Sequence, residues 1–199
     1  MVVAQPPRYT LCPTPFGELV LVWREEAEGA LLQRLYLPRD GASPLPRAQA
    51  EHAGCVAGEH PGIGLLGAAL VRGLRGGPLT LALAQESGVA LDLPACPAFQ
   101  QRVLLAEAAV PRGYVTTYGR LAAHLGAPQA ARAVGAALAH NPFPLLIPCH
   151  RALRGDLSLG GFQGGLAMKA ALLTMEGYTV VAGRVLANEA QLWYGAQVR

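Results

Sequence analysis

The sequence has almost no lysine and no long apolar run. Of its 16 basic residues only Lys169 is a lysine; the others are arginines, which suit bidentate and stacking contacts with phosphates and bases. No apolar stretch reaches about 18 residues without breakers, so a membrane span is not expected. The first residues, Met1 to Arg8, lack the basic-then-apolar order of a secretory signal, so we expect a cytoplasmic protein.

Cysteine is also scarce, and the four that occur are scattered. They are Cys12, Cys55, Cys96 and Cys149. Without a secretory signal we expect reduced thiols, each of them a core residue, a metal ligand or a nucleophile. The one local group of metal-binding types, His52, Cys55 and His60, lacks a fourth ligand in any standard pattern. A surface loop is therefore the better interpretation there, and no metal or other cofactor is expected.

Acidic residues are few in the second half of the chain. Residues 1–100 carry 7 arginines and 9 acids, a net charge of −2, whereas residues 101–199 carry 8 arginines, one lysine and 4 acids, a net charge of +5. This asymmetry hints at a nucleic-acid partner for the second half. Arginine-rich codon usage is the alternative explanation.

Residues 1–94 are predicted to form a mixed domain of strands and one helix. β-branched and aromatic residues between turn-forming segments predict strands over 18–25, 30–38, 78–85 and 89–94. A helix is predicted over 62–77, ended by Gly76 and Gly77. Nothing in this domain forms a catalytic constellation.

A composition change at "LPACP" (93–97) separates this domain from residues 95–178, which are predicted to be mainly helical. Helices are expected over 98–110, 118–126, 128–141 and 166–177, and Thr117 is a suitable N-cap for the second of these. The helices over 118–126 and 128–141, joined through Gly126, predict a helix-turn-helix. The fold class is thus α+β, and residues 179–199 are predicted to form a C-terminal tail without an assigned role.

The second helix of the helix-turn-helix is built almost wholly from small residues. Ala131 and Gly135 belong to an alanine-rich surface from which Arg132 is the single long polar side chain. One interpretation is a helix packed closely inside the protein, since alanine is a strong helix former. The other is a helix whose backbone approaches a duplex closely, with Arg132 projecting into it.

The sequence "PCHR" places a thiol next to an imidazole. Cys149 needs a neighbouring base to become a thiolate, and His150 adjoins it, although a bridging water or a tight turn fixed by Pro148 is needed to link them. Glu176, at the end of an apolar helix where a carboxylate opposes the helix dipole, is expected to have a specific partner. Taken alone, this motif fits core packing as well as catalysis.

Two other chemistries lack support. "GGFQGG" (160–165) does not follow a strand within a βαβ unit, as a phosphate-binding loop would. The chain has no G-x-S-x-G motif, so serine-hydrolase chemistry has no basis.

The order of several motifs distinguishes Cys149 from a packed thiol. They are "PRGYVTTYGRLA" (111–122), "AARAVGAAL" (130–138), "NPFPLLIPCHR" (141–151), "GGFQGGLAMK" (160–169) and "LLTMEG" (172–177). Together these motifs resemble the O6-alkylguanine-DNA alkyltransferases. The resemblance covers about residues 97–177 and reaches the first domain only weakly, where the family has a ribonuclease-H-like fold.

The resemblance implies a DNA repair protein that works once. Cys149 would take a methyl or other alkyl group from O6 of guanine, and possible activity on O4 of thymine is part of the same expectation. His150 would act as general base through a water, Glu176 would hold His150, and Asn141 would brace the loop that carries the nucleophile. Tyr118 would protonate the departing guanine at N3 and rotate the target phosphate.

The resemblance also implies how the protein would hold DNA. Arg132 would enter the base stack in place of a flipped nucleotide, with Ala131, Gly135 and Tyr118 at the duplex. The partner would be double-stranded DNA carrying O6-alkylguanine, bound by a monomer in the cytoplasm and nucleoid. The residues expected around the alkyl pocket are Ala152, Phe162, Gln163, Gly164 and Lys169.

Two positions depart from the family pattern. Phe162 stands where the family often has tyrosine, and Gln163 stands where small residues are common, so the preferred alkyl group is left open. Two rival functions are also open. One is a helix-turn-helix regulator that uses Cys149 as a sensor, and the other is a thiol hydrolase acting on small amides or esters.

Overall fold

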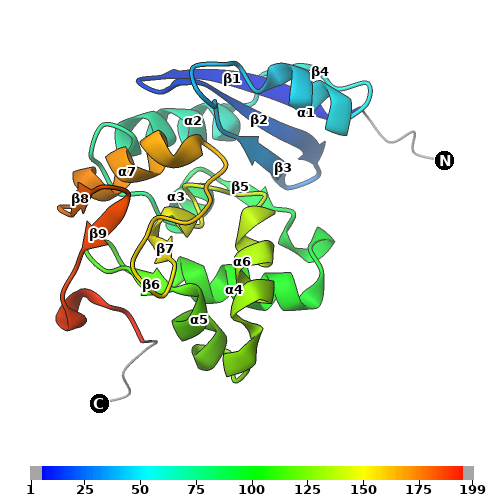
Figure 1. Cartoon of the computed structure of the whole chain (residues 1–199). Helices are drawn as coiled ribbons and strands as arrows, with labels where there is room; N and C mark the ends of the chain where they lie inside the picture. Colours follow the sequence, from blue (N-terminus) through cyan, green and yellow to red (C-terminus); the bar gives the residue numbers. More distant parts are fainter. Residues whose placement is uncertain (1–5, 195–199) are drawn as a thin grey trace. The chain divides into compact units, whose positions relative to one another are not determined.

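A computed structural model describes residues 6–194 of the chain, which divides into two compact units. The first unit comprises the residues up to Leu93 together with Pro142–Leu146, and the second comprises Pro94–Asn141 and the residues from Ile147 onward. The first contains a mixed sheet and the second is mainly helical (Figure 1). The predicted α+β class is confirmed.

The first unit is built on a five-stranded sheet with the order β4-β1-β2-β3-β5. Strands β1 (Arg8–Thr14), β2 (Gly17–Glu26) and β3 (Gly29–Tyr36) form an antiparallel meander, and β4 (Val56–Ala57) and β5 (Val89–Leu91) add parallel edges. The apolar run of β2 is buried on both faces, as its continuous hydrophobicity requires. The strands predicted over 18–25 and 30–38 are thus confirmed, and the one predicted over 89–94 is confirmed for Val89–Leu91 but wrong at its end, where the 3-10 helix η1 (Leu93–Ala95) begins.

Helices cover both faces of this sheet. On one face, α1 (Leu45–Glu51) contributes Ala48 to a cluster with Val20, Val22 and Tyr36. On the other, α2 (Pro61–Gly73) packs closely, because a side-chain carbon at Gly67 would lie 2.6 Å from the sulfur of Cys12. The helix predicted over 62–77 is confirmed in its first three turns.

The strand predicted over residues 78–85 is wrong. Residues Ala82–Glu86 form a short helix, α3, preceded by a turn. Its residues are alanine, leucine, glutamine and glutamate, which favour helix, and a short apolar run does not by itself distinguish a strand from a helix.

The second unit contains the predicted helix-turn-helix. The chain first forms the 3-10 helix η1 (Leu93–Ala95) and helix α4 (Ala98–Ala108). It then forms β6 (Thr116–Thr117), α5 (Tyr118–His124), the 3-10 turn η2 (Pro128–Ala130) and α6 (Ala131–Ala139). Thr117 caps α5 as predicted, since its hydroxyl accepts a hydrogen bond from the amide of Arg120 at 3.2 Å. Gly126 makes the turn with a φ of +73°, which glycine adopts without strain.

The nucleophile candidate follows a loop. It opens the 3-10 turn η3 (Cys149–Arg151), which leads into β7 (Ala152–Leu153); β7 pairs in parallel with β6, and α7 (Gly165–Met175) comes later. Strands β6 and β7 therefore fix the start of α5 beside the end of η3.

The residues predicted to be a tail fold onto the second unit as far as Tyr194. Strands β8 (Thr179–Val181) and β9 (Arg184–Leu186) pair antiparallel and are followed by η4 (Glu189–Gln191). Val185 and Leu192 join a buried cluster with Val115, Leu153 and Leu173. No helix among residues 6–194 is long and apolar enough to cross a membrane.

Candidate active site around Cys149

Cys149 is a buried thiol held on a tight turn. Its segment is a 3-10 helix closed by a 2.8 Å hydrogen bond from the amide of Arg151 to the carbonyl of Pro148, so Cys149 and His150 are not on an extended strand. Burial raises the pKa of the thiol to about 11, and a hydrogen bond with the Asn141 side chain opposes that rise. The thiol is therefore protonated at neutral pH and needs a base before it can attack.

His150 and Glu176 are in contact, as the family resemblance implied. Nε2 of His150 lies 3.1 Å from Oε1 of Glu176, and the imidazole is fully buried. Burial lowers the pKa of His150 against the opposing effect of Glu176, so the ring is neutral at pH 7. With the Nε2 proton directed at the carboxylate, Nδ1 presents its lone pair, and it has no hydrogen-bond partner among the described residues.

Arg151 is a second partner of Glu176. Its Nη2 lies 2.6 Å from Oε1 and its Nε lies 2.9 Å from Oε2, while Nη1 donates to the carbonyl of Val110 at 2.7 Å. Burial of Glu176 acts to raise its pKa, but the hydrogen bonds from His150 and Arg151 outweigh burial and bring the pKa down to about 2. The carboxylate is thus charged throughout the physiological range and holds the imidazole in one orientation.

Asn141 braces the loop before the thiol. Its Nδ2 donates to the carbonyl of Ile147 at 3.0 Å, and its own carbonyl accepts a hydrogen bond from the side chain of Gln163. Because Asn141 is fully buried, these bonds fix the backbone two residues ahead of Cys149.

Lys169 lies buried near the same thiol. Its Nζ donates to the carbonyl of Ala152 at 2.7 Å, and the carbonyl of Gly161 lies 3.4 Å away. Burial lowers the pKa of Lys169 to about 8, and the nearby Cys149 opposes that shift. Of the residues predicted for the pocket, Ala152 and Lys169 are thus in contact, and Gln163 is tied to Asn141.

Tyr118 begins α5 and points toward two glycines. Its ring lies 3.8 Å from the position that a side-chain carbon of Gly135 on α6 would occupy, and its hydroxyl lies 2.6 Å from the corresponding position at Gly160. Burial raises the pKa of Tyr118, with the charge of Cys149 acting in the same direction, so its hydroxyl remains a donor at neutral pH.

The remaining predicted residues lie around this centre or on the helix surface. The ring of Phe162 meets the His150 ring edge-on, with 6.4 Å between centroids, and Gly164 is the N-cap of α7. Arg132 is exposed on α6, next to the half-buried Ala131. Arg132 is therefore not packed inside the protein, and the approach of this helix to a duplex stays a prediction.

Sequence reasoning missed three residues of this neighbourhood: Glu107, Arg151 and Gly160. Arg151 belongs to the quoted "PCHR" segment, but its contact with Glu176 spans 25 residues of sequence. Glu107 falls among the apolar positions of α4, where a fully buried acid is an exception to the helical pattern. An acid at an apolar position of a helix can be seen in the sequence, and it could have drawn attention to Glu107.

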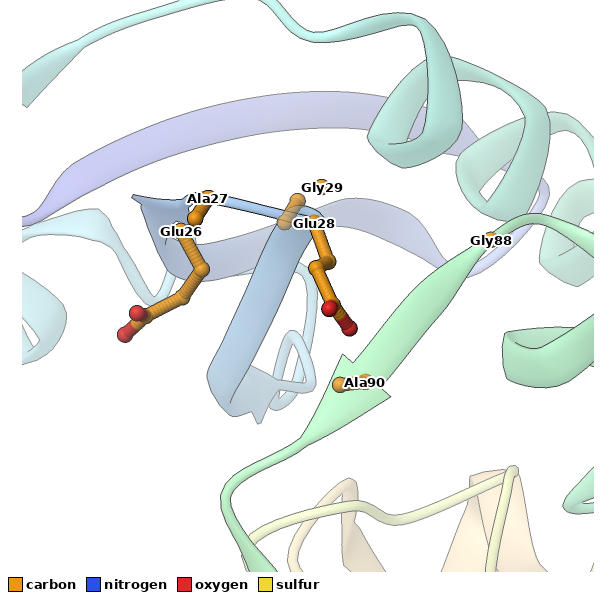
Figure 2. A pocket seen from close by; sticks show the side chains of 7 residues that line it. Glu26, Ala27, Glu28, Gly29, Gly88 and Ala90 are labelled. Carbon is orange, nitrogen blue, oxygen red and sulfur yellow. The ribbon is translucent and has the colours of Figure 1, made fainter.

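The first unit offers no comparable centre in the part of the chain that is described. No group of three or more His, Cys, Asp or Glu side chains among residues 6–194 is placed to hold a metal ion. A hollow beside the β2–β3 turn is lined by Glu26 and Glu28, with Gly88 and Ala90 across from them (Figure 2). It carries two carboxylates and no nucleophile.

Residues 98–178 match the family described as "6-O-methylguanine DNA methyltransferase, DNA binding domain". The chain is 46% identical over 90 residues to the methylated-DNA–protein-cysteine methyltransferase of Methanothermobacter thermautotrophicus, which covers 45% of this chain and 50% of that protein. It is 48% identical over 83 residues to the protein of the same description in Salmonella typhimurium, covering 42% of this chain and 48% of the relative. The chain thus spans about half the length of the curated relatives it matches.

Two solved structures are similar over most of the chain. An OGT of Mycobacterium tuberculosis in complex with DNA aligns with a TM-score of 0.65 and 28% identity, covering 85% of this chain and 92% of that one. An O6-methylguanine methyltransferase structure from the same organism aligns with a TM-score of 0.63 and 28% identity, covering 93% of this chain and 97% of that one. Because these alignments cover 85% and 93% of the chain, the likeness extends into the first unit.

Proposed function

We propose that the protein transfers the methyl group of O6-methylguanine in duplex DNA to its own Cys149, a proposal supported by the match of residues 98–178 to the DNA-binding domain of the 6-O-methylguanine DNA methyltransferases. One observation carries this proposal: the second unit combines a buried thiol with a neutral imidazole that a charged carboxylate holds, and it also contains a helix-turn-helix. A nucleophile and a surface that can bind a duplex are both needed to attack a base substituent in DNA.

The transfer is a displacement at the methyl carbon. The sulfur of Cys149 forms a bond to that carbon as the bond from carbon to O6 breaks, and the electron pair of that bond goes to the guanine. The thiol proton passes to Nδ1 of His150 through a water, which fits the unpartnered lone pair of that nitrogen. The product is a thioether on Cys149 and an unmodified guanine, so each protein molecule acts once.

Glu176 and Tyr118 manage the charges that this step creates. Glu176 stabilises the imidazolium that forms when His150 takes the proton, because its carboxylate stays ionised down to a pKa of about 2. Tyr118 donates its hydroxyl proton to N3 of the departing guanine. Lys169 and Asn141 stabilise the thiolate, the first by its charge and the second by a hydrogen bond.

The target base has to leave the duplex to reach a buried thiol. We assign to Arg132 the role of filling the gap in the stack, because it is the long exposed side chain on a helix surface of small residues that includes Ala131 and Gly135. The carbonyls of Cys149 and Ala152 would accept from the exocyclic amine of guanine, and Phe162, Gln163 and Gly164 would border the alkyl group. Larger alkyl groups and O4-methylthymine are further candidate substrates of the same pocket.

The test is an intact-mass measurement after incubation with a duplex that contains one O6-methylguanine. We expect a gain of one methyl group on the peptide that contains Cys149, stoichiometric with protein and then complete, and no gain in Cys149→Ser. Binding of the duplex with no mass change in the wild type would point to a regulator, and repeated turnover of a small ester or amide would point to a hydrolase. Either result would overturn the proposal.

A further inference from the structure

Glu107 is a buried carboxyl group that the proposed reaction does not use. It lies on α4 with no exposed surface, and neither of its carboxyl oxygens has a hydrogen-bond partner among the described residues. Burying an acid in this way is costly, and native proteins pair nearly all such groups. A leucine would fill the position at no such cost, so the presence of an acid calls for a reason.

Helix α4, which carries Glu107, contacts the 3-10 turn η3, which carries Cys149 and Arg151. The charged and titratable groups that act on it or feel its charge come from each neighbouring element of the second unit: Cys149 and Arg151 on η3, Lys169 on α7 and Tyr118 on α5. Helix α6 also packs against α4; Arg132 on that helix and His140 at its end are exposed. Glu107 is thus electrically coupled to the thiol and to the cation that supports the thiolate.

The charge of Glu107 acts against that of Lys169 at the thiol. Ionised Glu107 raises the pKa of Cys149, whereas Lys169 lowers it. Burial raises the pKa of Glu107 itself to about 8, with Lys169 and Arg151 opposing. The carboxyl is therefore largely neutral at pH 7 and becomes an anion in mildly alkaline solution.

We propose that Glu107 is a positioning residue that restrains Cys149: while protonated it leaves Lys169 free to support the thiolate, and once ionised it opposes thiolate formation. The reactivity of Cys149 then rises less steeply in alkaline solution than that of a thiol without such a neighbour. The importance of this restraint for DNA repair rests on the proposed function, in which Cys149 is consumed by a single alkylation. The restraint itself concerns only the thiol.

The experiment compares the wild type with Glu107→Gln, which keeps the shape of the side chain and removes its charge. Each protein reacts with iodoacetamide, a small neutral reagent, between pH 6 and 9, and the modification rate of the peptide that contains Cys149 is followed by mass spectrometry. We expect a ratio of variant to wild-type rate near one at pH 6, rising with a midpoint near pH 8 to about fivefold at pH 9. A ratio that is flat with pH, or that falls, overturns the proposal.

Two further variants separate charge from packing. Glu107→Leu is also neutral and suits an apolar site, so its rate of Cys149 modification has to rise above the wild-type rate with pH in the same way. A rise that occurs in Glu107→Gln alone contradicts the proposal. Glu189→Gln is the matched control, because this carboxylate lies in the same unit with 72% of its side chain exposed, paired with Arg120. Its ratio stays near one at every pH.

The iodoacetamide reaction needs no DNA, so its outcome is independent of the proposed function. Faster alkaline modification in Glu107→Gln supports the restraint even if the wild type takes no methyl group from O6-methylguanine, a result that would overturn only the repair function. Methyl transfer by the wild type with a flat rate ratio would overturn only the restraint.

Discussion

A side-chain carbon at Gly160 would lie 2.6 Å from the hydroxyl oxygen of Tyr118, closer than such atoms approach in proteins. Gly160 also has a φ of +64°, a conformation that favours glycine. The loop before α7 therefore approaches the tyrosine hydroxyl through a residue that has no side chain. A side chain at this position would have to displace the hydroxyl from the place where the departing guanine is proposed to meet it.

Gly160→Ala is expected to displace Tyr118 and to strain the loop. The backbone conformation alone costs about 1–3 kcal/mol of stability, and we expect the rate of methyl transfer to fall by at least about tenfold because the hydroxyl moves. Denaturant unfolding and single-turnover transfer assays measure the two effects.

The neighbouring Gly161 provides the control for that substitution. A side-chain carbon there would meet no atom within 4 Å, and its φ is not in the left-handed region, so Gly161→Ala should leave stability and transfer close to wild type. In a Tyr118→Phe background the hydroxyl is gone, and Gly160→Ala should cost less stability than in the wild type. An equal cost in both backgrounds would show that the hydroxyl contact is unimportant.

The carboxylate of Glu176 should govern stability in acid. Its pKa in the folded protein, about 2, lies below its ordinary value, so the stabilisation is complete above the ordinary pKa and is lost as the pH falls through about 2. Glu176→Gln should lower the free energy of unfolding at pH 7 by about 3 kcal/mol, because Arg151 and His150 lose a charged partner in a buried setting. Chemical denaturation from pH 7 to pH 2 measures this difference.

The difference between wild type and Glu176→Gln should shrink as the pH is lowered. Glu189→Gln is again the reference, since its exposed ion pair with Arg120 should contribute less than about 1 kcal/mol at any pH. A Glu176→Gln penalty that is constant with pH would mean that packing, not charge, stabilises this corner of the site.

Local signals predicted the helix-turn-helix and strands β2 and β3 well, but not strand β1 (Arg8–Thr14). Thr117 caps α5 because a threonine hydroxyl satisfies a free amide wherever a helix begins, and the continuous apolar run of β2 needs two covered faces. These are properties of neighbouring residues. The short apolar segment before Glu86 carried no such signal, and there the strand prediction was wrong.

The partners of the site residues depend on contacts distant in sequence. The unfavourable position of Glu176 at a helix end predicts a partner without identifying it, and the family resemblance implies His150, which is in contact with it. That Arg151 also holds Glu176 follows from the packing of η3 near the end of α7. The burial of Glu107 and the approach of Gly160 to Tyr118 are likewise set by tertiary packing. No pattern within one helix or loop contains that information.

The segment after the family match should contribute to the stability of the second unit. Leu192 is buried in a cluster with Val115 and Leu153, whereas Leu186 is 58% exposed on β9. We expect Leu192→Ala to lower the free energy of unfolding by about 2–3 kcal/mol and Leu186→Ala to change it by less than about 0.5 kcal/mol. Equal effects in denaturant unfolding would mean that residues 179–194 do not pack on the unit in solution.

Arg132 should matter for methyl transfer from duplex DNA and not for transfer from the free base. If it fills the stack in place of a flipped nucleotide, Arg132→Ala removes a contribution of a few kcal/mol, so transfer from an O6-methylguanine duplex should slow by about 30-fold or more. Reaction with free O6-methylguanine requires no flipping and should stay within about threefold of wild type. Single-turnover rates with both substrates measure how differently Arg132→Ala affects transfer from the duplex and from the free base.

Arg132→Lys distinguishes stacking from charge at the same position. Lysine keeps the positive charge for phosphate contacts and lacks the planar guanidinium that stacks on bases, so it should recover duplex binding much more than it recovers the transfer rate. Full recovery of both by lysine would indicate that Arg132 serves as a phosphate contact. Equal losses on the duplex and the free base in Arg132→Ala would instead place its effect within the folded site, although the side chain is exposed on α6.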